Sequence, residues 1–303
     1  MDNNYSIARR IWRILYPPGV FLIIQFIVMG VIGFVAGIYI AADGTAGGMT
    51  ITYIETIVGE AMRFSTEHSM LILLISNIIC FAVFLPVWLK ARQNLDPYKN
   101  DGPAVVCLLI IGLFAAFNVV QMVLFALTNV MDYFPEYGEV SELFITDAFI
   151  VQLVSIGIVA PVVEEIVFRG ILISRMKWMP VWVSVLIQGM LFGLVHLNVF
   201  QGLYAFVAGI LLGMVFIKFR SIIIVIAGHM AYNLTSVLLA EYASETTSGM
   251  ILALSAIVLP VCAVLTIKRQ KARKLLTELD IMPPPVYSPG DPWSGYHPRD
   301  PWQ

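Results

Sequence analysis

The chain has 303 residues, of which 59% are hydrophobic and 13% are charged, and its formal net charge is −2. That charged share is about half of what globular proteins carry, which excludes an ordinary soluble domain. The nearly neutral balance gives no basis for nucleic-acid binding. The composition instead predicts an all-α, polytopic transmembrane helix bundle in contact with membrane lipids.

A membrane-spanning helix needs roughly 20 mostly apolar residues, and the sequence predicts about eight such spans. In chain order they cover residues 20–42, 70–89, 104–127, 149–168, 180–197, 199–217, 221–240 and 250–267. The fourth span is expected to continue as helix beyond Arg169. Only the stretch LNVFQ separates the fifth and sixth spans, and seven spans would result if that stretch were re-entrant.

The basic residues predict the orientation of the bundle, because lysine and arginine accumulate in cytoplasmic segments. With the N-terminus in the cytoplasm, all of them fall on the inner side except Arg63 in an outer loop and Arg169 within the fourth span. We therefore expect both termini in the cytoplasm. A bacterial plasma membrane is the expected setting, because no organelle signal is recognised.

The chain is expected to divide into five parts. Residues 1–19 form an interfacial segment, and residues 20–144 form the N-terminal helices and loops. Residues 145–240 form the core that carries the polar groups described next. Residues 241–280 hold the last span with its basic flank, and residues 281–303 form a flexible, proline-rich tail.

Three apolar segments of this core carry ionisable or amide side chains at helical spacing: EEIVFR (164–169), FGLVH (192–196) and HMAYN (229–233). Such groups are costly in hydrocarbon and face the interior of a bundle. Glu165 and Arg169 are four residues apart, so we expect them to pair on one helix face. Glu164 points about 100° away from them and stays free to accept a proton.

His229 and Asn233 are also four residues apart and project together. They can donate two hydrogen bonds to a developing oxyanion, or the amide could orient the imidazole. Phe192 is expected to pack beside His196. Because the three segments lie at comparable depth, we expect their polar groups to share one water-filled chamber. A peptidase would use these groups for hydrolysis. The same groups could equally serve a proton-coupled carrier or a membrane scaffold.

At these residues the sequence resembles the CPBP family, the CAAX-protease and bacteriocin-processing (Abi) intramembrane peptidases. The family pattern is EExxxR, FxxxH and HxxxN on successive membrane helices, and the three motifs stand here in that order within residues 145–240. The resemblance implies an intramembrane endopeptidase that cleaves a membrane-associated or lipidated peptide or protein. Prokaryotic members of the family are linked to bacteriocin immunity.

The resemblance also implies a role for each polar residue. Glu164 and His196 would activate the attacking water. His229 and Asn233 would stabilise the oxyanion or complete a metal site. Glu165 and Arg169 would hold the pocket in shape. A Glu–His–His set can bind Zn²⁺, and the same groups can also act without metal in a glutamate-type peptidase. The sequence leaves both open, and it defines neither the substrate nor the oligomeric state.

Overall fold

The computed structural model describes residues 6–43, 51–92, 103–136 and 148–242 continuously, together with isolated positions between 249 and 271. These residues form helices, and no strand occurs among them, so the prediction of an all-α chain is confirmed. In chain order the helical segments are α1 (Ile7–Asp43), α2 (Ile51–Glu67), α3 (Ser69–Arg92), α4 (Pro103–Thr128), η1 (Val130–Tyr133), α6 (Phe149–Val154), η2 (Ser155–Val159), α7 (Ala160–Glu165), η3 (Ile166–Ile173), α8 (Val181–Leu194), α9 (Val199–Phe219) and α10 (Ile222–Tyr242).

Six segments of the described residues are long and apolar enough to cross a membrane: Ile7–Ala42, Ser69–Arg92, Ala104–Thr128, Phe149–Ile173, Val199–Phe219 and Ile222–Tyr242. The prediction of a multi-pass membrane protein is thereby confirmed. The fourth span runs on past Arg169 to Ile173, as expected.

The remaining predicted spans differ in how far the structure describes them. The fifth span, predicted at 180–197, is the 14-residue helix α8, which is shorter than the roughly 20 residues that a full crossing needs. The eighth, at 250–267, is described only at isolated positions. The tail at 281–303 lies outside the described residues.

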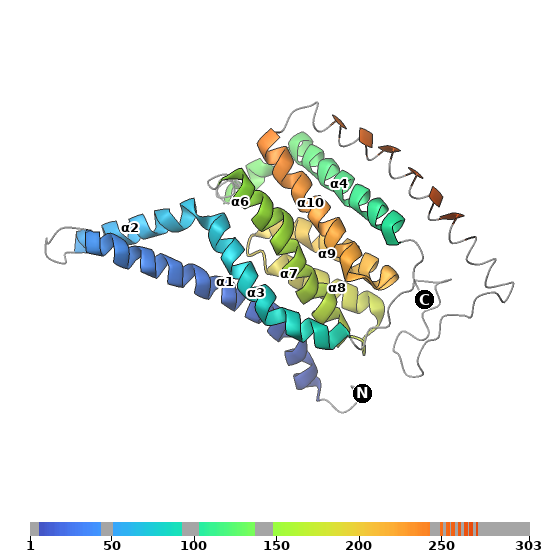
Figure 1. Ribbon diagram of the computed structural model, residues 1–303, viewed down its shortest axis with the longest axis horizontal. Helices are drawn as coiled ribbons and strands as arrows, with labels where there is room; N and C mark the ends of the chain where they lie inside the picture. Colours follow the sequence, from blue (N-terminus) through green and yellow to red (C-terminus); the bar gives the residue numbers. More distant parts are fainter. Residues whose placement is uncertain are drawn as a thin grey trace.

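Helices α1 and α2 lie side by side and extend away from the rest of the bundle (Figure 1). Helix α1 begins at Ile7, so the described part of the predicted interfacial segment is its first turns. The contact with α2 uses Gly33 and Gly37, where an added Cβ would lie 3.2 Å from Ser65 Oγ and 3.7 Å from Ala61 Cβ. The span prediction left α2 unassigned, because its glutamates and Arg63 interrupt the apolar run.

A continuous helical rod from Phe149 to Ile173 forms the centre of the bundle; it comprises α6, η2, α7 and η3. Helix α3 packs along one side of the rod and α10 along another, and α4 covers α10 (Figure 1). Every residue of η3 is buried. The rod therefore places the sequence EEIVFR in the interior of the protein.

Helices α8 and α9 form a tightly packed hairpin, and α8 contacts the η3 end of the rod. Glycines allow the close approach: a Cβ on Gly193 would lie 2.6 Å from the carbonyl oxygen of Gly202, and one on Gly209 would lie 3.1 Å from Gly189 Cα. The small-residue pairs of these helices thus act in packing.

A short turn joins the two helices of this hairpin. Leu197 has a positive φ of 55°, and the Asn198 side chain caps α9 by accepting a hydrogen bond from Gln201 N at 2.9 Å. The sequence predicted that His196 continues the fifth span. Instead, α8 ends at Leu194 and His196 lies in the turn, because these local contacts stop one helix and start the next.

Candidate active site

The central rod is α-helical in α7, which carries both glutamates, and it widens into the π-helical segments η2 and η3 on either side. Such wide turns are rare and occur frequently at functional sites. In η2 the N–H of Ala160 reaches back five residues to the carbonyl oxygen of Ser155. The next donor in that register would be residue 161, which is a proline and has no N–H. The carbonyl of Ile156 is therefore left without that backbone partner.

Asn233 of α10 supplies the missing hydrogen bond. Its Nδ2 donates to the Ile156 carbonyl oxygen at 2.9 Å, across 77 residues of sequence. One N–H of this amide thus ties α10 to the rod, and the amide nitrogen carries a second N–H. The sequence offered Asn233 as an oxyanion donor or as a residue that orients an imidazole, and did not foresee a partner on the rod's backbone.

Glu165 and Arg169 form a completely buried ion pair, as their spacing predicted. Arg169 Nη1 lies 2.6 Å from Glu165 Oε1, and both side chains are 0% exposed. Two further contacts hold the guanidinium. Its Nη2 donates to the Gly209 carbonyl oxygen of α9 at 3.2 Å. Its Cζ lies over the Phe192 ring of α8, 4.5 Å from the ring centroid. These contacts stabilise the buried guanidinium charge, whose burial without a partner would cost several kcal/mol.

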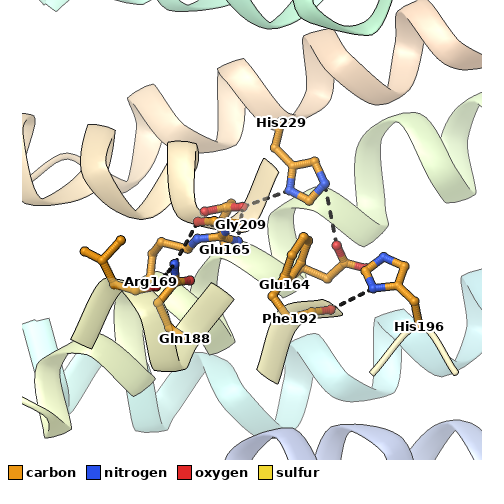
Figure 2. A network of polar contacts seen from close by, with 9 residues as sticks. Glu164, Glu165, Arg169, Gln188, Phe192, His196, Gly209 and His229 are labelled. Carbon is orange, nitrogen blue, oxygen red and sulfur yellow. Dashed lines mark hydrogen bonds and ion pairs between the residues drawn. The ribbon is translucent and has the colours of Figure 1, made fainter. Parts of the chain in front are cut away.

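His229 of α10 also contacts this ion pair. Its Nδ1 donates to Glu165 Oε1 at 2.8 Å, so that single carboxylate oxygen accepts from both the imidazole and Arg169. A carboxylate on Nδ1 fixes the tautomer and the direction of a histidine ring. The other ring nitrogen, Nε2, consequently faces Glu164, whose Oε2 lies 3.6 Å away (Figure 2).

Glu164 and Glu165 therefore occupy different environments although they are neighbours in sequence. Glu165 is fully buried, and its Oε1 accepts from both Arg169 and His229. The Glu164 side chain keeps 15% exposure, and its carboxylate approaches only the outer nitrogen of His229 at a distance too long for a hydrogen bond. Of the two, Glu164 is the carboxylate that can take up a proton from a water molecule.

His196 reaches the same region from the turn after α8. Its Nδ1 donates to the Phe192 carbonyl oxygen at 2.7 Å, so in the neutral ring Nε2 is the acceptor. The Phe192 ring packs edge-on against both imidazoles, with centroid distances of 5.1 Å to His196 and 5.6 Å to His229. The expected contact between Phe192 and His196 is thus present, and Figure 2 shows Glu164 and His196 on the same side of His229.

The structure brings the glutamates, Arg169 and both histidines together around Phe192, whereas the amide of Asn233 points to the rod backbone. The network also contains a residue that lies outside the three motifs. Gln188 of α8 donates to the Gly209 carbonyl oxygen at 2.7 Å, beside Arg169. The signal in the sequence was its spacing: it precedes Phe192 by four residues and His196 by eight.

A metal ion would need three or more donor atoms directed at one point. In the described part of the chain, no group of three His, Cys, Asp or Glu side chains could hold one. Glu164 Oε2 and His229 Nε2 are two possible donor atoms and lie 3.6 Å apart. Glu165 Oε1 already accepts from Arg169 and His229. The described residues, as arranged, do not fit a zinc centre.

Comparison with known proteins concerns the segment that forms this site. Residues 146–235 match the family model described as type II CAAX prenyl endopeptidase Rce1-like. No curated protein matches the chain, and no solved structure matches it. The matched residues span the rod, the α8–α9 hairpin and most of α10, so they include all three motifs. The resemblance to the CPBP family is thereby confirmed over this segment.

Proposed function

We propose that this protein is an intramembrane endopeptidase that hydrolyses a peptide bond in a prenylated or otherwise membrane-associated peptide or protein, with water activated by Glu164 and His196. The observation that carries the proposal is that the two adjacent glutamates lie in different environments. Glu165 is held by Arg169 and His229, and Glu164 is left partly exposed beside the outer nitrogen of His229.

The reaction begins with a water molecule between the Glu164 carboxylate and His196 Nε2. His196 accepts a hydrogen bond from this water and orients it, because its Nδ1 is fixed on the Phe192 carbonyl. Glu164 takes one proton while the water oxygen attacks the scissile carbonyl carbon. A positioned carboxylate that acts as general base contributes about 10²- to 10⁴-fold to such a step.

Attack opens the carbonyl double bond and places a negative charge on its oxygen. His229 Nε2, when it carries a proton, and the second N–H of Asn233 are the donors proposed for this oxyanion. Glu165 holds His229 by its Nδ1 and thereby aims Nε2. Glu164 then returns its proton to the amide nitrogen as the C–N bond breaks, which releases an amine and a carboxylic acid and restores the carboxylate.

The test is cleavage by the purified protein in proteoliposomes. A panel of prenylated peptides, the same peptides without the lipid, and transmembrane peptides would be incubated with wild type and with Glu164→Gln, and the products identified by mass spectrometry. Cleavage of the lipidated or transmembrane peptides by wild type only is the expected result. If no peptide is cut in a Glu164-dependent manner, the peptidase proposal fails.

The same proteoliposomes separate the enzyme from the carrier. Solute or proton uptake that requires Glu164, without any peptide cleavage, would replace the peptidase with a proton-coupled carrier. We also propose that the protein lies in a bacterial plasma membrane and that it is linked to bacteriocin immunity. Cell fractionation tests the first, and bacteriocin sensitivity of a strain that lacks the protein tests the second.

A further inference from the structure

Gln188 lies outside the three motifs but inside the polar network that surrounds Arg169. It is 0% exposed and stands in the middle of α8. Its Nε2 donates to the Gly209 carbonyl oxygen of α9 at 2.7 Å and to the Val185 carbonyl oxygen of its own helix at 3.0 Å. Burying a primary amide costs free energy unless hydrogen bonds to defined partners offset the loss of water.

The Gly209 carbonyl oxygen is shared between Gln188 and Arg169. Arg169 Nη2 donates to it at 3.2 Å, so the amide and the guanidinium converge on one acceptor (Figure 2). Gln188 Oε1 and Arg169 Nε are both buried and have no hydrogen-bond partner among the described residues. Each of these two groups carries a desolvation cost that no hydrogen bond offsets.

Space for this arrangement is made by small residues on α9. A Cβ on Gly213 would come within 2.4 Å of Gln188 Nε2, so only glycine leaves room for the amide there. One turn along α8 from Gln188, the Phe192 ring lies beneath the Arg169 guanidinium. Helix α8 therefore holds Arg169 twice, through the shared Gly209 carbonyl and through the aromatic ring.

We propose that Gln188 is a positioning residue for the peptidase site. It fixes the Gly209 carbonyl against Arg169, Arg169 fixes Glu165 at 2.6 Å, and Glu165 aims His229 through Nδ1 at 2.8 Å. The path crosses from α8 to α9, to the rod and to α10. The proposal deepens the proposed function and rests on it, because His229 is the group whose direction is being set.

The test compares Gln188→Leu, which has a similar volume and no donors, with Gln188→Glu, which places a second carboxylate beside Arg169. Ser184→Ala is the matched control: Ser184 is buried one turn away on the same face of α8, and it donates to the Met176 carbonyl oxygen at 3.2 Å, outside the network. Each protein is assayed for kcat and KM on a peptide that wild type cleaves, and for thermal stability in detergent.

Loss of an oriented buried hydrogen bond is expected to lower kcat of Gln188→Leu about tenfold with KM unchanged. Gln188→Glu is expected to lose more, because the new carboxylate draws Arg169 away from Glu165. Ser184→Ala keeps wild-type kcat. Equal kcat in Gln188→Leu and wild type, or the same loss in Ser184→Ala, would refute the positioning role.

A spectroscopic measurement keeps the inference testable without activity. The chain has four histidines, so ¹⁵N-histidine NMR resolves their rings, and His229→Gln assigns the signal. Gln188→Leu is expected to shift the His229 ring nitrogens and to leave those of His68 unchanged. If wild type cleaves nothing but the shift occurs, the proposed function has failed and the positioning path stands; an unshifted His229 signal overturns the path itself.

Discussion

His229 Nδ1 and Arg169 Nη1 donate to the same oxygen of Glu165, at 2.8 Å and 2.6 Å. This oxygen links α10 to the central rod, and through Arg169 the link continues to α9. Glu165 anchors the polar network, and its neighbour Glu164 is the carboxylate proposed to act on water.

The two glutamates should respond differently to the same substitution. Glu164→Gln is expected to reduce cleavage about 10²- to 10⁴-fold, because it removes the general base. Its thermal stability should change little, because the side chain is partly exposed and makes no short contact. Glu165→Gln, the matched control, should lower stability as well as kcat, since it weakens the contacts with Arg169 and His229. Wild-type cleavage by Glu164→Gln would contradict the assignment.

The buried ion pair should show strong coupling in a double-mutant cycle. Arg169→Met leaves the Glu165 carboxylate buried without its cation and is expected to destabilise the protein by about 3–5 kcal/mol. The double variant Glu165→Gln/Arg169→Met removes both charges and should be less destabilised than Arg169→Met alone. Denaturation of the four proteins in detergent measures the coupling, and simple additivity of the two losses would rule out the pair.

Asn233 should have a structural role that a second substitution can replace. Asn233→Ala leaves the Ile156 carbonyl without its donor and is expected to lower stability by about 1–3 kcal/mol. Pro161→Ala in that background restores a backbone N–H in the π-helical register and should recover part of the loss. Pro161→Ala alone is the control.

Activity of that double variant separates the two roles of the amide. If stability recovers while kcat stays low, Asn233 also serves the reacting oxyanion, as proposed. If kcat recovers together with stability, the residue only ties α10 to the rod. No gain in stability from Pro161→Ala would show that the Ile156 carbonyl is not the group that Asn233 satisfies.

Packing between α8 and α9 should depend on Gly193. In Gly193→Ala the new Cβ would meet the Gly202 carbonyl oxygen at 2.6 Å, which forces the helices apart and is expected to cost about 1–3 kcal/mol. Gly30→Ala is the control, because nothing lies within 4 Å of its Cβ position in α1. Alanine there should be neutral or slightly stabilising. Equal thermal denaturation of Gly193→Ala and wild type would contradict the close approach.

Chelation should leave the reaction intact. The proposed water activation uses Glu164 and His196, and the described donors do not form a three-ligand group. After dialysis against a strong chelator, and with metal content measured on the same sample, we expect cleavage at the wild-type rate. Loss of activity that returns with stoichiometric Zn²⁺ would establish a metal enzyme instead.

The sequence by itself determined the class of protein, most of the spans and the pairing of Glu165 with Arg169. These depend on the length of apolar runs and on the four-residue repeat of a helix, which are local properties of the chain. The motif order also indicated the resemblance that the family model shows for residues 146–235.

Tertiary structure alone decided which partner each polar group meets. Glu165 with His229, Arg169 with the Gly209 carbonyl, and Asn233 with the Ile156 carbonyl join residues 64, 40 and 77 positions apart. Such contacts depend on how each helix is rotated and how closely glycines let it approach its neighbour, and local spacing carries neither quantity. The proline at 161 acts in the same way: it leaves the Ile156 carbonyl free, and only the packed α10 supplies the Asn233 donor.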